Sequence, residues 1–360
     1  MTPAFAGPRQ AAVFAALLAA LMVAPLVVAN LGVLDRSQVY PTLPVGAGPY
    51  SHIQRQVFEE SADLDVVFVG SSLMWSGIDA PYVQRELSRV LGRDAVVTVL
   101  ASVWPGLDRD YAILRDLLAR RRVRLVVFQL PNRNRPTADP AAAINRVGDE
   151  PHVYAYRFFR VGELPAGDLP PRAETALYAG AVLGLPRHLL SFVRPNYTTP
   201  APVAANLGAR FVALGFYGAQ YEPYRPSPPA LGANELIYSP ATAATFGFFD
   251  EPLPPYQTHF AHLIADLLKQ HEVPAVVLHI PQANEISANV VEERVNWIEE
   301  FDIDGSMVGI PPTRLFAGMS DAEVERFFLN DHLNENGTIY FTRAVMPALL
   351  RLATEHDKTN

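Results

Sequence analysis

The sequence predicts an α/β fold built on a parallel sheet, and three observations support this prediction. Short apolar runs alternate with amphipathic helical patterns over residues 63–134, and the alternation resumes at about residue 256. This rhythm is typical of parallel strands joined by crossover helices. The first run, residues 66–69, ends in the turn Gly70-Ser71-Ser72, and a polar cluster at residues 330–337 lies between two helical patterns near the other end. The fold class and two candidate site segments therefore come from the same pattern.

Each element is expected from hydrophobic periodicity and from turn residues at its ends. Five parallel strands are expected, at residues 66–69, 95–100, 125–130, 275–280 and 314–316. The helices are expected at residues 79–91, 107–118, 256–270, 290–301, 321–328 and 339–350. Asp79 is placed to cap the first of these helices, with Pro81 in its first turn. In this arrangement the serine turn follows the first strand and the polar cluster follows the last.

The composition limits the classes of function. The chain has 360 residues, enough for one large domain with an ample core. Its formal net charge of −8 disfavours nucleic acid as a partner, because phosphate binding relies on an excess of Lys and Arg. The absence of cysteine excludes disulfides, thiolate catalysis and cysteine-ligated zinc. His259 and His262 have metal-ligand spacing, but no acidic or cysteine ligand accompanies them, so we expect no metal or cofactor.

An uncharged stretch near the N-terminus predicts a membrane anchor. Residues 10–34 carry no charge and would form a helix of about 37 Å, against a hydrocarbon core of roughly 30 Å. Arg9 precedes the stretch, which by the positive-inside rule places the N-terminus in the cytoplasm. We expect a single-pass protein of the cytoplasmic (inner) membrane with its C-terminal domain outside, in the periplasm. A cleaved signal peptide is the alternative, but its apolar region is usually shorter.

The remaining chain divides into a linker and one domain. Residues 1–35 form the cytoplasmic tip and anchor in this interpretation, and the proline- and glycine-rich residues 36–62 form an extended linker. The domain covers residues 63–355. Within it the alternation stops at about residues 136–255, which are rich in proline and too long for a simple loop. We expect a mostly helical insertion there.

The serine turn and the polar cluster predict a nucleophile and its activator. A serine after a buried strand lies at the carboxyl edge of the sheet, where open α/β sheets bind ligands. Serine needs an adjacent base at neutral pH, and His332, preceded by Asp331, is the candidate. The residues alone do not separate Ser71 from Ser72 as the nucleophile.

Gly70-Ser71-Ser72-Leu73 resembles the Gly-Asp-Ser-Leu block of the SGNH (GDSL) hydrolase superfamily, and Asp331-His332-Leu333-Asn334 with Gly337 resembles its histidine block. The resemblance implies a three-layer, flavodoxin-like fold. It implies Ser72 as the nucleophile and His332 as the base. It also implies an oxyanion hole made by the amides of Ser72 and Gly106 and the side chain of Asn132, which follow the first, second and third strands.

Three positions depart from the family pattern. Ser71 replaces the aspartate of the first block, and Leu130 replaces a glycine two residues before Asn132. The acid that orients the histidine normally lies three residues before it, where this chain has Leu329. Asp331 is the nearest carboxylate and would serve only if the loop turned its side chain back. A Ser-His dyad, or an acid from elsewhere, is the alternative.

Membrane-anchored members of this superfamily often resemble enzymes that add or remove acyl groups, commonly acetyl, on envelope polysaccharides. The resemblance therefore implies an O-acyltransferase or esterase whose partners are an acylated glycan or acyl donor and a membrane-embedded acyl-transfer protein. The missing aspartate suggests the alternative, a catalytically inactive binding or assembly component of the same machinery.

Overall fold

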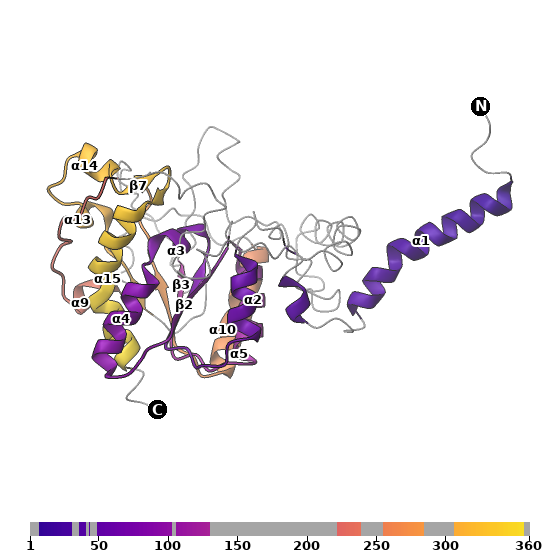
Figure 1. Cartoon of the computed structure of the whole chain (residues 1–360), viewed down its shortest axis with the longest axis horizontal. Helices are drawn as coiled ribbons and strands as arrows, with labels where there is room; N and C mark the ends of the chain where they lie inside the picture. The colour runs from indigo at the N-terminus through magenta and orange to yellow at the C-terminus, as the bar shows by residue number, and fades with distance from the viewer. Residues whose placement is uncertain are drawn as a thin grey trace.

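The centre of the structure, a computed structural model, is a six-stranded sheet with the strand order β2-β1-β3-β5-β6-β4 (Figure 1). The strands in that order are β2 (Val97–Ala101), β1 (Val66–Gly70), β3 (Val126–Gln129), β5 (Ala275–Leu278), β6 (Met307–Val308) and β4 (Ile237–Tyr238). The structure describes residues 7–30, 36–40, 43, 49–102, 106–129, 222–238, 255–283 and 306–355. The descriptions below concern these residues.

The sheet is parallel except at one edge. β1 pairs in parallel with β2 and β3, β3 with β5, and β5 with β6, whereas β4 pairs antiparallel with β6. Every residue of β1, β2, β3 and β5 is buried, as expected of strands covered on both faces. The predicted α/β class is thus confirmed. The sheet of five strands, all parallel, is not, because the described sheet has six strands and its edge strand β4 is antiparallel.

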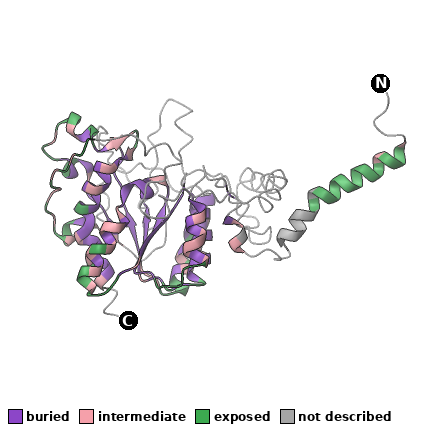
Figure 2. Ribbon diagram, in the orientation of Figure 1, coloured by how far each residue is buried: buried purple, intermediate pink, exposed green. Residues whose placement is uncertain are grey.

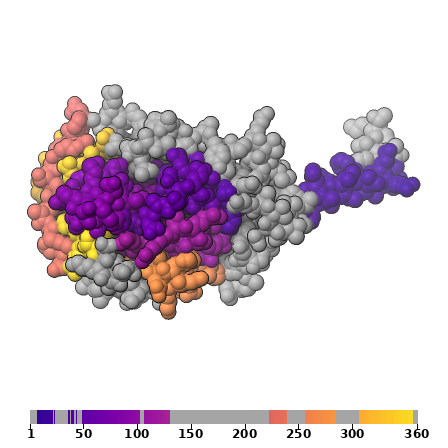
Figure 3. All heavy atoms as spheres, turned by 60° about the horizontal axis from the view of Figure 1, so that its bottom comes forward, coloured from indigo at the N-terminus to yellow at the C-terminus, as the bar shows by residue number. Residues whose placement is uncertain are grey.

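Helices cover both faces of the sheet (Figures 1 and 2). One face packs against α2 (Tyr50–Phe58), α5 (Leu107–Leu118) and α10 (Pro255–Gln270). The other packs against α3 (Ser72–Gly77), α4 (Ala80–Leu91), α9 (Ala233–Leu236) and α15 (Glu335–Glu355). Figure 3 shows α10 and α5 side by side on the outside of the molecule. This arrangement leaves the carboxyl ends of the strands as the edge where loops can form a site.

The ends of α4 follow from local chemistry. The side chain of Asp79 accepts a hydrogen bond from the amide of Tyr82 at 3.1 Å, and Gly92 ends the helix in the left-handed conformation with φ 66°. The predicted cap and the predicted helix are therefore both confirmed.

The strand predicted at residues 314–316 is wrong. These residues belong to a short helix, α13 (Pro312–Leu315), and its terminal residue Phe316. Pro312 favours the first turn of a helix, since its fixed φ suits that position and its missing N–H is not needed there. The strand beside β5 is β6, which lies just before these prolines.

The linker predicted at residues 36–62 is partly a component of the domain. The helix α2 lies within it, and Tyr50, Ile53 and Val57 are buried in the core beside α5. A short 3-10 helix, η1 (Arg36–Gln38), precedes α2, and the Arg36 side chain forms an ion pair with Asp116 of α5. The prolines and glycines of this region interrupt the hydrophobic periodicity, so the apolar face of α2 was not predicted from the sequence.

The N-terminal helix α1 (Pro8–Asn30) lies within the predicted anchor region. The part coloured in Figure 2 is mostly exposed, and its exposed side chains include several apolar ones. Among the described residues we find no helix with both the length and the apolar character needed to cross a membrane. The predicted insertion falls mostly outside the described residues; its described part, 222–238, contains α9 and β4. The helix predicted at residues 290–301 also lies outside them.

A small hairpin lies beside the main sheet and leads into α15. Its strands are β7 (Phe328–Leu329) and β8 (His332–Leu333), and α14 (Asp321–Glu325) precedes it. Gly337, in the first turn of α15, packs directly on the carbonyl oxygen of Phe327, so a Cβ atom at this position would overlap that oxygen. The hairpin and the helix therefore touch through backbone at a position that only glycine fits.

We predict that Gly337→Ala lowers the free energy of unfolding by about 1–3 kcal/mol, the usual cost of overpacking. Gly232→Ala is a matched control, because its Cβ would meet only Glu235 Oε2 at 3.5 Å and its φ of −75° suits alanine. Chemical denaturation of the two variants measures the difference. Equal free energies of unfolding for the two variants would show that the hairpin moves aside to accept the Cβ atom, and would contradict the prediction.

Candidate active site

Ser72 stands at the carboxyl edge of the sheet, directly beyond β1. The strand ends at Gly70, Ser71 caps α3, and Ser72 is the first residue of that helix. A Cβ atom on Gly70 would lie 2.6 Å from the Cβ of Gln129 on the neighbouring strand. Glycine therefore lets β1 and β3 come close at the point where the chain turns into α3.

Gln129, the last residue of β3, holds this turn in place. Its side-chain oxygen Oε1 accepts hydrogen bonds from the amide of Ser71 at 2.8 Å, the hydroxyl of Ser71 at 2.8 Å and the amide of Met74 at 3.2 Å. The hydroxyl of Ser71 in turn accepts from the amide of Leu73 at 3.3 Å. The amide of Ser72 itself donates no hydrogen bond among the described residues. The first turn of α3 therefore leaves one N–H group unused, and it belongs to the candidate nucleophile.

The hairpin of β7 and β8 presents His332. Its two-residue turn places Asn330 in the left-handed region with φ 53°, a conformation that asparagine tolerates better than most residues. The Asn334 side chain binds both sides of the hairpin: Nδ2 donates to the carbonyls of Arg326 and Phe328, and Oδ1 accepts from the amides of Asn336 and Gly337. The position of His332 is thus fixed by its neighbours on both sides.

Two threonines of α15 fasten this helix to the C-terminal end of α3. Thr338 Oγ1 donates to the carbonyl oxygen of Ser76. One turn later, Thr342 Oγ1 lies 3.3 Å from the carbonyl oxygen of Gly77 and accepts from the amide of Asp79 at 2.9 Å. The helix that carries the serine and the helix that follows the histidine hairpin are therefore joined by buried hydrogen bonds and not only by apolar packing.

The structure brings Ser72 and His332 together. The Ser72 Oγ and His332 Nε2 atoms are 2.8 Å apart, within hydrogen-bond distance, although the residues are 260 positions apart in the chain. Burial lowers the pKa of His332 below its usual value, and the charge of Asp331 partly opposes this shift. The imidazole is therefore neutral at neutral pH and can accept the proton of the hydroxyl.

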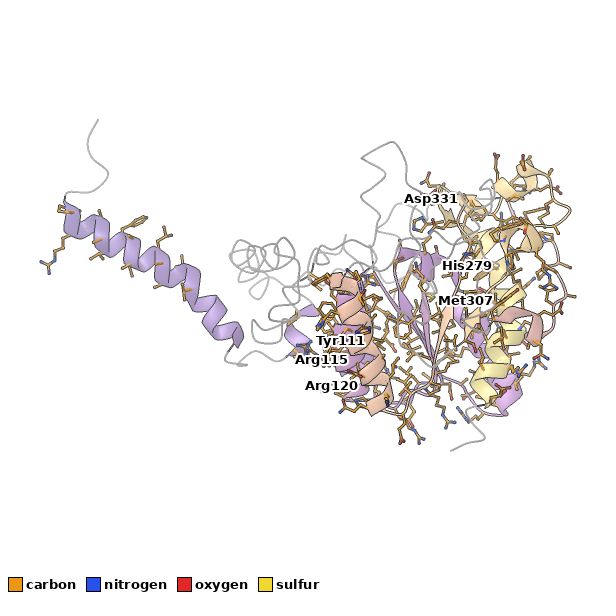
Figure 4. All side chains as sticks on the ribbon, turned by 180° about the vertical axis from the view of Figure 1, so that it is seen from behind. Tyr111, Arg115, Arg120, His279, Met307 and Asp331 are labelled. Carbon is orange, nitrogen blue, oxygen red and sulfur yellow. The ribbon has the colours of Figure 1, made fainter. Side chains whose placement is uncertain are left out.

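The structure does not place Asp331 in the role of orienting acid. Asp331 is exposed in the turn of the hairpin, and its carboxylate forms no hydrogen bond with His332 in the described part of the chain. Figure 4 shows it at the outer rim of the domain. The reason is its position, since Asp331 lies in the two-residue turn of the hairpin and His332 is the first residue of β8. Asp331 acts on His332 only through its charge.

The oxyanion donors predicted for this site are only partly described. Gly106 is buried at the N-cap of α5, beyond the end of β2, and its N–H donates no hydrogen bond among the described residues. Gly70 and Ala101 are paired in register, so the loops that carry Ser72 and Gly106 leave the same edge of the sheet. Asn132 and Leu130 lie outside the described residues.

A buried arginine that the sequence reasoning missed supports the same edge. Arg109 of α5 is fully buried and donates to the carbonyl oxygen of Gly70 at 2.8 Å, to the hydroxyl of Ser102 at 2.5 Å and to the carboxylate of Asp110. Burial is the largest influence and lowers the pKa of Arg109, but Asp110, Tyr50 and Asp108 together outweigh it, so the pKa is raised. The only signal in the sequence was the charged triplet of residues 108–110 in an otherwise apolar helix start.

The described residues contain no group of three His, Cys, Asp or Glu side chains arranged to hold a metal ion. His259 and His262 lie on α10, and His279 is buried directly after β5 (Figure 4). The described site offers a hydroxyl, an imidazole and backbone amides.

No protein-family model matches the chain, and no curated protein matches it. The interpretation of the site consequently depends on its geometry and on the resemblance of its short motifs.

We predict that ester turnover depends on the protonation of His332, with an apparent pKa below the usual value of a histidine. Activity is retained where the imidazole is neutral and is lost as the pH falls through that lowered pKa. Because the charge of Asp331 raises the pKa of His332, Asp331→Asn should move the midpoint to still lower pH and leave the plateau nearly unchanged. A pH profile of kcat/KM with a model acetyl ester measures both.

A plateau lowered about 10⁴-fold in Asp331→Asn, the loss seen when a full triad is deprived of its acid, would contradict this prediction. Glu325→Gln is a suitable control, since it removes another exposed carboxylate of the neighbouring helix α14.

Proposed function

We propose that this chain is a serine-dependent enzyme that transfers or hydrolyses O-acyl groups. The observation that carries the proposal is the hydrogen-bond distance of 2.8 Å between Ser72 Oγ and His332 Nε2 at the carboxyl edge of a largely parallel sheet. A serine hydroxyl is a weak nucleophile until a base removes its proton, and a half-buried imidazole with a lowered pKa is suited to do so. The order of the motifs adds support through the SGNH resemblance, with the three-layer, flavodoxin-like fold that it implies.

The proposed reaction forms an acyl-serine in two steps and then transfers the acyl group onward. Ser72 Oγ forms a bond to the carbonyl carbon of the acyl group while its proton passes to His332 Nε2, and the carbonyl electron pair moves onto oxygen. The tetrahedral intermediate then collapses and the bond to the leaving oxygen breaks, while His332 returns the proton to that oxygen. Water or a sugar hydroxyl repeats the sequence on the acyl-serine, which gives hydrolysis or transfer respectively.

The oxyanion of each intermediate needs fixed donors, each worth roughly 3 kcal/mol. The unused amide of Ser72 and the amide of Gly106 support this assignment, because among the described residues neither is engaged elsewhere. The side chain of Asn132 completes the proposed set by resemblance. The catalytic unit of this scheme is therefore the Ser72–His332 pair, on which Asp331 acts only through its charge.

We propose an acylated, commonly acetylated, envelope polysaccharide or its acyl donor as the substrate, with a membrane-embedded acyl-transfer protein as partner. This part rests on the resemblance and on the uncharged residues 10–34, which suggest attachment to the cytoplasmic membrane with the domain on its outer side. Cell fractionation of the full chain tests the location, and recovery in the soluble fraction would contradict it.

One observation favours a second candidate, a catalytically inactive binding or assembly component. Asp331 forms no hydrogen bond with His332 in the described part of the chain, so the imidazole receives no orientation from that carboxylate. A protein of this kind would use the same edge of the sheet to hold a glycan without cleaving a bond.

We predict that a fluorophosphonate probe labels the full-length chain covalently at Ser72, because the probe reacts with serines activated by a base. Mass spectrometry of the labelled peptide identifies the position. Ser72→Ala should abolish labelling, while Ser76→Ala, which changes a buried serine of the same helix, should retain it.

Absence of labelling in the wild-type chain would favour the binding component. Labelling that survives Ser72→Ala would show that another residue reacts.

A further inference from the structure

The carboxamide of Gln129 is placed to do more than hold the turn of α3. Its oxygen accepts from three donors, two on Ser71 and one on Met74. Because only the oxygen of an amide accepts hydrogen bonds, these donors determine which end of the carboxamide is oxygen. The nitrogen end, Nε2, is therefore directed away from them.

The nitrogen Nε2 carries two N–H donors, and among the described residues it donates to no acceptor. The residue as a whole is only 8% exposed, at the end of β3 and at the edge of the sheet that carries Ser72. The N–H groups of Nε2 are not sealed from the surface, so they can donate to a group bound at this edge of the sheet.

The surroundings hold this donor rigidly. Gly70 leaves room for the Gln129 side chain, since a Cβ at Gly70 would approach Gln129 Oε1 to 2.8 Å. Ser71, whose amide binds Oε1, directly precedes Ser72, whose amide is unused among the described residues. Two donors without an acceptor among the described residues thus lie at the carboxyl edge of the sheet, one on the candidate nucleophile and one on the side chain that binds its turn.

We propose that Gln129 is a catalytic residue whose Nε2 donates a hydrogen bond to the oxyanion formed when Ser72 attacks an acyl group. The inference rests on the proposed function and adds a side-chain donor to that site. The developing negative charge on the carbonyl oxygen is met by Gln129 Nε2 and the Ser72 amide together, and no proton is transferred to or from Gln129. The same side chain, through Oε1, holds the Ser72 turn against the end of β3.

Gln129→Glu separates these two roles because it replaces only the NH₂ group, by an oxygen of nearly equal size. The carboxylate retains an acceptor for Ser71 and Met74, so the turn and the fold are kept. It removes the donor and sets a negative charge against the oxyanion. Gln129→Met, which loses both the acceptor and the donor, serves as the comparison.

With p-nitrophenyl acetate as the probe and the full-length chain in detergent, we expect Gln129→Glu to lower kcat by about 10²–10³, the loss typical of one oxyanion donor. KM and the melting temperature should stay close to those of the wild type. Gln129→Met should lower kcat and the melting temperature together, since the Ser71 and Met74 donors then lose their acceptor.

Two results would overturn the inference while the proposed function stands. One is a Gln129→Glu variant with kcat near that of the wild type; the other is a loss of kcat that parallels a loss of melting temperature. A wild-type chain that neither hydrolyses the ester nor labels at Ser72 overturns the proposed function, and this inference falls with it.

Discussion

The site depends on one hydrogen bond between two residues that are 260 positions apart, Ser72 and His332. Such a contact persists only if both side chains are held by the surrounding structure, because ordering each residue costs about 1–2 kcal/mol of backbone entropy. The chain provides two supports. Gln129 and Gly70, at the ends of β3 and β1, fix the serine turn, and Asn334 and Gly337 fix the histidine hairpin. The bonds from Thr338 and Thr342 then join the two supports across α3 and α15.

The same logic explains why charge is buried beneath the site. Arg109 takes the last carbonyl of β1 and the hydroxyl of Ser102 beyond β2, so a single side chain connects the exits of two neighbouring strands. Burying an unpaired arginine would be costly, and the partner Asp110 together with neutral acceptors reduces that cost. Apolar packing alone would define the relative positions of the carboxyl ends of β1 and β2 less well. Ser72 follows the first of these ends and Gly106 follows the second.

The sequence allowed the α/β class, most of the central strands and the serine-histidine pair to be predicted, because these leave strong local signals. Val-rich buried runs indicate β1, β2 and β3, and Asp79 with Pro81 indicates the start of α4. The hairpin that presents His332 was not predictable, since strands of two residues have no periodicity. The direction of Asp331 follows from that hairpin. The roles of Gln129 and Arg109 depend on contacts between strands and helices distant in the chain, which a single sequence does not reveal.

The central claim is that Ser72 and His332 act as one catalytic unit, and a double-mutant cycle on ester turnover tests it most directly. Ser72→Ala, His332→Ala and the double variant are compared in the full-length chain. Residues of one unit are strongly non-additive, so each single change should lower kcat about as much as both together. If the two losses instead multiply in the double variant, or if either single variant retains wild-type turnover, the residues act independently and the account is contradicted.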